Sequence, residues 1–218
     1  MILAVIFDLD GTVLDNEGDW ETAFGEVIKN EKLTIKSVES EDCIHTPGIG
    51  LTANWKRLAP EADEQKIAEL SAKVKDYYQE NFGDNLRVMN GFESLVEKCQ
   101  ELNLPTALAT ASNWDVVEGE LEKLNLYLAF EVTTTGDEVL AHKPDPEIYL
   151  LTVQKLGVDP ENCLVIEDSL AGVESGTTAG CQVVGLISDY ATEEELKKAG
   201  AKWTVESLEE VVDILNIP

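Results

Sequence analysis

Four groups of polar residues, each following an apolar segment, stand out in this chain of 218 residues because together they suit one kind of reaction. They are Asp8-Leu9-Asp10-Gly11-Thr12, Thr110-Ala111-Ser112-Asn113, Lys143-Pro144-Asp145-Pro146 and Glu167-Asp168-Ser169. In the first group, Asp8 can attack as a nucleophile while Asp10 transfers a proton as general acid and base. Two carboxylates that face an anionic substrate need a cation, and carboxylate oxygens are ligands that Mg²⁺ commonly takes in proteins. The groups therefore indicate nucleophilic catalysis on an anionic centre such as a phosphate.

Each group taken alone also has an ordinary structural explanation. An isolated Asp-x-Asp pair is often solvated loop acid, and Thr110 alone could mark the start of a helix. An isolated Lys143 would usually be an exposed lysine, and Asp168 could merely cap the following helix. The joint arrangement of the four groups favours the catalytic interpretation.

The elements that position these groups alternate between strands and helices over the last two thirds of the chain. Strands are predicted at 3–7, 106–109, 131–134, 164–166 and 182–186, with a weaker one at 202–205. Helices are predicted at 92–102, 115–124, 147–156 and 170–179, where apolar residues recur every three or four positions. This alternation predicts an α/β fold with a doubly wound, Rossmann-like parallel sheet. In such sheets ligands bind beyond the carboxyl ends of the strands, which is where the four groups lie.

Residues 16–86 interrupt the alternation with helical patterns at 20–30 and 64–82 and no convincing strand. Residues 40–52, which include His45, Pro47 and Gly48, are predicted to form a loop. We therefore expect two domains, an α/β core of residues 1–15 and 87–218 and a small inserted helical cap of residues 16–86.

The chain resembles the haloacid dehalogenase (HAD) superfamily, in the branch with a helical cap inserted after the first motif, because DLDGT, KPDP and IEDS occur in family order. The resemblance implies that Asp8 is the nucleophile, Asp10 the general acid and base, and Lys143 the cation that screens charge between Asp8 and the phosphate. It implies Mg²⁺ as cofactor, held by Asp8, the main-chain carbonyl of Asp10 and Asp168, with Glu167 as an outer-shell or alternate ligand. Thr110 and the amides around Ala111 and Ser112, with Asn113 beside them, would bind phosphate oxygens.

Two departures from related branches favour a phosphatase. Asp10 disfavours dehalogenases and phosphonatases of the family, which usually lack an acid there. β-Phosphoglucomutases carry a histidine ten residues after the second Asp, where this chain has Trp20, and an arginine in the cap loop that is missing after Gly48. The expected activity is Mg²⁺-dependent hydrolysis of a small phosphorylated metabolite through an aspartyl-phosphate. The alternatives are a hexose-phosphate mutase and, less favoured, a catalytically idle HAD-fold binding protein.

The cap is expected to set substrate specificity by closing over the site. Trp20 and His45 are the foremost candidates to touch substrate, followed by Asn54, Lys56 and Arg57. Trp20 could instead pack between cap helices, and Lys56 and Arg57 could form a solvated face.

The formal net charge of −27 disfavours partners that bear many negative charges. Nucleic acids and anionic membrane surfaces are bound through Lys and Arg, so we expect neither as a partner. The apolar segment at 1–7 is too short for a signal peptide, and no stretch reaches the roughly 18 apolar residues of a membrane span. The four cysteines are widely spaced and are expected to be reduced. These features predict a cytoplasmic protein, and the resemblance implies a monomer or weak oligomer.

Overall fold

A computed structural model describes residues 1–35 and 44–216, and in it six strands form one parallel sheet. The strands are β1 (Ala4–Phe7), β2 (Thr106–Ala109), β3 (Val132–Thr134), β4 (Cys163–Glu167), β5 (Gln182–Leu186) and β6 (Trp203–Val205). Their order across the sheet is β3-β2-β1-β4-β5-β6, so the chain winds outward from β1 in both directions. In this doubly wound order the topological switch lies at β1, between β2 and β4, and ligands bind at the carboxyl ends there.

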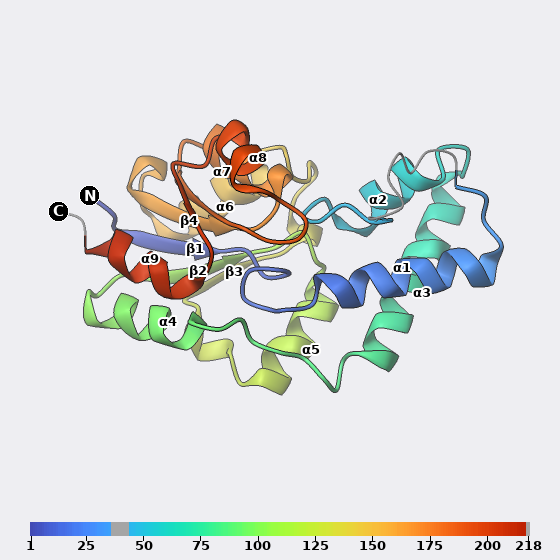
Figure 1. The fold of residues 1–218 in the computed structure, drawn as a ribbon, viewed down its shortest axis with the longest axis horizontal. Helices are drawn as coiled ribbons and strands as arrows, with labels where there is room; N and C mark the ends of the chain where they lie inside the picture. The colour runs from blue at the N-terminus through green and yellow to red at the C-terminus, as the bar shows by residue number, and fades with distance from the viewer. Residues whose placement is uncertain (36–43, 217–218) are drawn as a thin grey trace.

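Helices cover both faces of the sheet (Figure 1). One face carries α4 (Phe92–Glu101), α5 (Trp114–Leu124) and α9 (Leu208–Leu215), and the other carries α6 (Glu147–Leu156), α7 (Leu170–Thr178) and α8 (Glu193–Ala199). Successive strand residues point to opposite faces, so Val5 and Phe7 of β1 pack under the first layer while Ala4 and Ile6 pack under the second. Burial on both faces explains why the strands are continuous apolar runs.

Three helices lie beyond one end of the sheet and form a separate apolar core (Figure 1). They are α1 (Glu17–Glu31), α2 (Gly50–Leu58) and α3 (Glu64–Asn81). Their core is built around Phe24, Trp55 and Leu70, and Val116 of α5 packs against it from the sheet side. The helical insert is therefore present as expected, while its exact boundaries at residues 16 and 86 remain a prediction.

The α/β fold class is confirmed, and every predicted strand and helix is present with ends shifted by at most a few residues. One prediction needs correction: α2 begins at Gly50, inside the predicted loop at 40–52, of which residues 40–43 lie outside the described residues. Helices α2, α8 and α9 were not predicted from the sequence, and short 3₁₀ segments occur at Tyr127–Ala129, Gly136–Glu138 and Pro160–Asn162. Among the helices of the described residues, none has the length and apolar character that crossing a membrane requires.

Candidate active site

Asp8 lies directly after β1, at the carboxyl edge of the sheet, against a buried lysine. The ammonium of Lys143 donates to Asp8 Oδ1 at 2.5 Å, to Glu167 Oε1 at 2.7 Å and to the Ala109 carbonyl at 3.1 Å. Burial alone would lower the pKa of Lys143, but the carboxylates of Asp8 and Glu167 raise it above its ordinary value. Burial raises the pKa of Asp8, and the adjacent ammonium opposes this shift. Lys143 therefore carries a positive charge beside Asp8, as the resemblance implies for it.

Glu167, the last residue of β4, is surrounded by hydrogen-bond donors on both oxygens. Oε1 accepts from Lys143 and from the Tyr149 hydroxyl at 2.6 Å, and Oε2 accepts from the Ser169 hydroxyl at 3.0 Å. A Cβ at Gly172 would lie 1.8 Å from Glu167 Oε1, so the first turn of α7 packs directly on this carboxylate. Both oxygens of Glu167 are thus used in hydrogen bonds that fix Lys143 and the loop before α7.

A metal could bind next to these groups. One oxygen each of Asp8, Glu167 and Asp168 lies within 4.8 Å of the others, and all three residues are buried. Asp168 Oδ1 accepts from the Thr12 hydroxyl at 3.4 Å, while Oδ2 is buried without a hydrogen-bond partner among the described residues. Burial, followed by the charges of Glu17, Glu167 and Asp8, raises the pKa of Asp168. An orphaned oxygen within a set of hard oxygen donors fits Mg²⁺, which neutralises such a cluster and prefers oxygen ligands.

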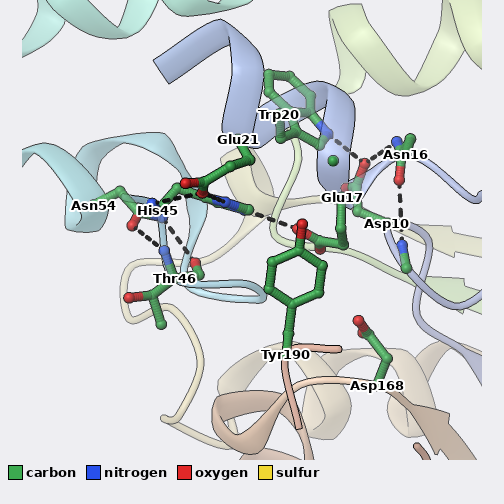
Figure 2. A network of polar contacts seen from close by, with 12 residues as sticks. Asp10, Asn16, Glu17, Trp20, Glu21, His45, Thr46, Asn54, Asp168 and Tyr190 are labelled. Carbon is green, nitrogen blue, oxygen red and sulfur yellow. Dashed lines mark hydrogen bonds and ion pairs between the residues drawn. The ribbon is translucent and has the colours of Figure 1, made fainter. Parts of the chain in front are cut away.

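Asp10 lies on the loop after β1 beside Trp20 and Asn16 (Figure 2), and its two oxygens have different partners. Oδ1 accepts from the side-chain amide of Asn16 at 2.6 Å and from the indole N–H of Trp20 at 2.8 Å. Oδ2 makes a 2.7 Å hydrogen bond with the Ser112 hydroxyl. Trp20, predicted to touch substrate, therefore contacts the expected general acid–base residue.

The loop after β2 carries the predicted phosphate-binding residues. Thr110 is fully buried, and its hydroxyl oxygen accepts from the Ser112 amide at 3.0 Å. That amide, predicted to bind phosphate, is thus already paired within the loop. Ala111 packs closely against Gly136, where an added Cβ would lie 2.3 Å from the Ala111 carbonyl oxygen. Asn113 is the N-cap residue of α5 and lines the cavity described next.

A cavity of about 350 Å³ lies between the sheet edge and the helical insert. Its core side includes Asp8, Asp10 and the loop 110–113, and its cap side includes residues of α1, α2, α3 and the turn before α2. The two sides touch, because a Cβ at Gly48 would lie 2.2 Å from Ser169 Oγ. Gly48 has φ +79°, so glycine serves both this close approach and the left-handed backbone. The cap therefore closes over Asp8 and Asp10.

His45, also predicted to touch substrate, lines the cavity with its ring between two glutamates of α1 (Figure 2). Nε2 lies 2.8 Å from Glu17 Oε2, and Nδ1 lies 3.1 Å from Glu21 Oε2. Burial lowers the pKa of His45, but both carboxylates outweigh it and raise the value to about 9. The imidazolium stacks on Phe24 with ring centroids 5.5 Å apart. His45 therefore joins α1 to the turn before α2, and its ring nitrogens face protein carboxylates.

The other cap candidates have structural contacts. Asn54 accepts from the Thr46 amide at 2.7 Å and donates to the Thr46 carbonyl at 2.9 Å, which fixes the turn before α2 (Figure 2). Lys56 and Arg57 are exposed, and within the described part of the chain neither lines the cavity. Arg57 instead donates to the Ile44 carbonyl.

Four residues in the hydrogen-bond and ion-pair networks around the expected site were not found from the sequence. They are Asn16, Glu17, Tyr78 and Tyr149. Asn16 had a local signal, since asparagine before a helix suggests an N-cap, but its side chain turns to Asp10 and makes no capping bond. The tyrosines lay within regular apolar patterns and gave no separate signal.

A carboxylate pair and a buried lysine at the switch point of a doubly wound sheet, closed by a helical cap, define a class of phosphoryl-transfer sites. The family model described as haloacid dehalogenase-like hydrolase matches residues 5–186, and the chain belongs to this family. It is 31% identical to a phosphorylated carbohydrates phosphatase of Thermotoga maritima over 217 residues, which cover 98% of each chain. It is 30% identical to the protein CbbY of Rhodobacter capsulatus, covering 94% of this chain and 93% of that one. The crystal structure of CbbY from Rhodobacter sphaeroides in complex with phosphate superposes with a TM-score of 0.82 at 25% identity, covering 97% and 96% of the two chains.

Proposed function

We propose that the protein is a Mg²⁺-dependent phosphatase that hydrolyses a small phosphorylated metabolite of the phosphorylated-carbohydrate class through an aspartyl-phosphate on Asp8. The observation that carries the proposal is the placement of Asp8 and Asp10 on the wall of one cavity between the core and the helical insert, with Lys143 against Asp8. The names of the Thermotoga relative and of the phosphate-bound CbbY structure support the substrate class.

In the first half-reaction, a carboxylate oxygen of Asp8 attacks phosphorus while the bond from phosphorus to the ester oxygen breaks. Asp10 gives its proton to the departing ester oxygen, so the alcohol leaves neutral. Lys143 reduces the repulsion between the Asp8 carboxylate and the phosphate dianion, because its charge lies 2.5 Å from Asp8 Oδ1.

In the second half-reaction, Asp10 takes a proton from water, which attacks the phosphorus of the aspartyl-phosphate. Asp8 is released as a carboxylate, inorganic phosphate leaves, and Asp10 is protonated again for the next cycle. Mg²⁺, held by Asp8 and Asp168 with Glu167 behind them, would supply positive charge that stabilises the phosphoryl oxygens. The main-chain carbonyl of Asp10 is proposed as a further ligand.

The cap supplies a wall that excludes bulk water from these steps. Apolar side chains of Trp20, Phe24 and Val116 line the cavity beyond the acids, together with the hydroxyl of Ser71. A cavity of this size accommodates a phosphate with a small polyol or sugar, and we propose that the protein works as a monomer or weak oligomer without a nucleic-acid or membrane partner.

The test measures phosphate release from p-nitrophenyl phosphate with MgCl₂ and with EDTA, followed by a screen of hexitol phosphates, hexose phosphates and phosphoglycolate. We expect Mg²⁺-dependent activity that Asp8→Asn abolishes, while Asp213→Asn, the same change at an exposed position of α9, retains it. Activity that survived Asp8→Asn would rule out the mechanism. Conversion of glucose 1-phosphate to glucose 6-phosphate would identify the mutase alternative, which Trp20 disfavours because an indole cannot exchange protons as an imidazole can. Phosphate binding without turnover would identify an idle binding protein.

A further inference from the structure

A buried acid on α5 takes no part in the reaction described above. Glu120 is 4% exposed, and its Oε1 accepts from the Tyr78 hydroxyl at 2.8 Å. Its Oε2 has no hydrogen-bond partner among the described residues. Burial, with the charge of Asp10 next in importance, raises the pKa of Glu120 well above its ordinary value. A buried acid is costly, so its contact with Tyr78 calls for an explanation.

The contact is the end of a hydrogen-bonded path that leads to Asp10. The Tyr78 hydroxyl donates to Glu120 and accepts from Asn16 Nδ2 at 2.9 Å. The same Asn16 nitrogen donates to Asp10 Oδ1 at 2.6 Å, while Asn16 Oδ1 accepts from the Gly11 amide at 3.2 Å. The path joins the loop after β1, the start of α1, α3 and α5, and so crosses from cap to core.

The second donor on Asp10 also depends on Tyr78. The ring of Trp20 stacks on the ring of Tyr78 with centroids 3.8 Å apart and planes 3° apart. This stacking places the indole N–H 2.8 Å from Asp10 Oδ1. Both donors to Asp10 Oδ1 therefore contact Tyr78: Asn16 donates to its hydroxyl, and Trp20 stacks on its ring.

The two donors determine which oxygen of Asp10 can carry the proton. An indole N–H and an amide NH₂ donate and do not accept, so neither can receive an O–H from Oδ1. The proton of a neutral Asp10 is therefore confined to Oδ2, beside the Ser112 hydroxyl, which can either donate or accept. Oδ2 is then the oxygen that gives the proton to the ester oxygen as the bond to phosphorus breaks.

We propose that Tyr78 and Glu120 are positioning residues for Asp10: Glu120 orients the Tyr78 hydroxyl, Tyr78 orients Asn16 and Trp20, and these direct Asp10 Oδ2 into the cavity. The inference rests on the proposed function, since it assigns Asp10 a proton to transfer. In this proposal the cap also aligns the general acid, because Asp10 is oriented only when Tyr78 of α3 contacts Glu120 of α5.

The test uses the dependence of the reaction on the leaving group. An alkyl phosphate needs an acid to protonate its ester oxygen, whereas p-nitrophenolate is stable enough to leave without one. The constant kcat/KM covers the steps up to departure of the alcohol, so a misplaced acid lowers it for alkyl phosphates and spares it for p-nitrophenyl phosphate. The alkyl probe is whichever of a hexitol phosphate, glucose 6-phosphate and glycerol 2-phosphate the enzyme cleaves fastest.

Tyr78→Phe keeps the stacked ring and removes the hydroxyl. We expect the ratio of alkyl to aryl kcat/KM to fall about tenfold, part of the 10²–10⁴ that general acid catalysis supplies. Tyr77→Phe, the same change one residue earlier on α3, is the matched control and should keep the ratio. A parallel fall of both constants, or an unchanged ratio, in Tyr78→Phe would show a merely structural role and overturn the inference.

Glu120 provides a second, independent comparison. Glu120→Leu removes the acceptor and should lower the same ratio as Tyr78→Phe does, whereas Glu120→Gln keeps an acceptor oxygen and should recover most of it. Equal ratios in the two variants would overturn the role of Glu120, and if the Leu variant does not fold, the Gln variant and Tyr78→Phe still decide the question. A wild-type enzyme that released phosphate from none of the probes would instead overturn the proposed function.

Discussion

Lys143 shows how much one residue contributes to this site. Its ammonium contacts two buried carboxylates, Asp8 and Glu167, at 2.5 and 2.7 Å. The side chain itself is fully buried. The lysine therefore offsets the negative charge of Asp8 and Glu167 without lining the cavity itself. Both acids depend on Lys143 for charge compensation, because neither forms an ion pair with another cation among the described residues.

Lys143→Met is expected to abolish phosphatase activity and to destabilise the metal-free protein by about 3–5 kcal/mol at neutral pH, because it leaves buried carboxylates without a counter-charge. Urea unfolding in EDTA measures the loss. The destabilisation should shrink as the pH falls and Asp8, whose pKa is raised by burial, becomes protonated. Lys198→Met, at an exposed position of α8, is the control and should unfold like the wild type. A Lys143→Met protein as stable as wild type at pH 7 would contradict the ion-pair argument.

Asp168 is expected to gain a ligand when a cation binds, because its Oδ2 is buried without a hydrogen-bond partner among the described residues. Mg²⁺ at about 100 times its dissociation constant should stabilise the folded state by about 2.7 kcal/mol. Thermal unfolding with MgCl₂, against KCl at matched ionic strength, measures this. In Asp168→Asn the shift should be lost, while the metal-free variant should be no less stable than wild type since a neutral amide replaces a buried acid. A full Mg²⁺ shift in the variant would show that the cation binds elsewhere.

That the motif residues gather at one edge of the sheet could be predicted from the sequence, but the contacts that hold them there could not. Asp8, Asp10, Lys143 and Glu167 were named from motif types and spacing, and the structure brings their side chains together. Asn16 and Tyr78 are 62 residues apart, and the hydrogen bond between them, which links Tyr78 to Asp10 through Asn16, forms only when the helices of the insert pack together. No local pattern encodes such a contact.

Among the helices and strands, the ones that could be predicted from the sequence are those that are long enough and buried enough to leave a clear apolar pattern. Strand β5 and helix α6 were predicted at their exact ends, since an apolar run and a periodic pattern of ten residues are strong signals. Helix α8 has seven residues and one buried apolar side chain, Leu196, so no periodicity could reveal it. Helix α2 begins with Gly50, a residue typical of loops, and its position depends on the turn that Asn54 holds.

The turn before α2 is joined to α1 by ion pairs of His45, whose charge depends on pH. The pKa of His45 is raised from about 6.5 to about 9 by Glu17 and Glu21, so the folded state binds the proton more tightly than the unfolded state. This stabilisation is fully present below pH 6.5 and is lost as the pH rises through about 9. The difference in unfolding free energy between wild type and His45→Gln should therefore be largest below pH 6.5 and decline toward pH 9. Urea unfolding across this range measures it, and a constant difference would mean that packing on Phe24 dominates.

For the whole molecule, the net charge of −27 is a property of the core more than of the cap. Residues 16–86 carry a net charge of −7, and the remainder carries −20. The acids of the active site account for a small part of this total. A phosphate dianion nevertheless can approach, because at physiological salt the Debye length is about 8 Å and distant surface acids are screened.

The same surplus of negative charge should destabilise the fold at low ionic strength, because like charges repel in the compact state. In EDTA, raising KCl from 20 to 300 mM should stabilise the protein by about 1 kcal/mol, which for a chain of this size raises the unfolding midpoint by roughly 2–4 °C. Glu97, Glu118 and Glu122 are exposed on α4 and α5 and make no ion pair with the described residues. Replacing all three by Gln should raise the midpoint at 20 mM KCl and weaken its dependence on salt. If salt lowered the wild-type midpoint instead, the surface ion pairs would outweigh the repulsion, and the triple variant would lose its advantage at every salt concentration.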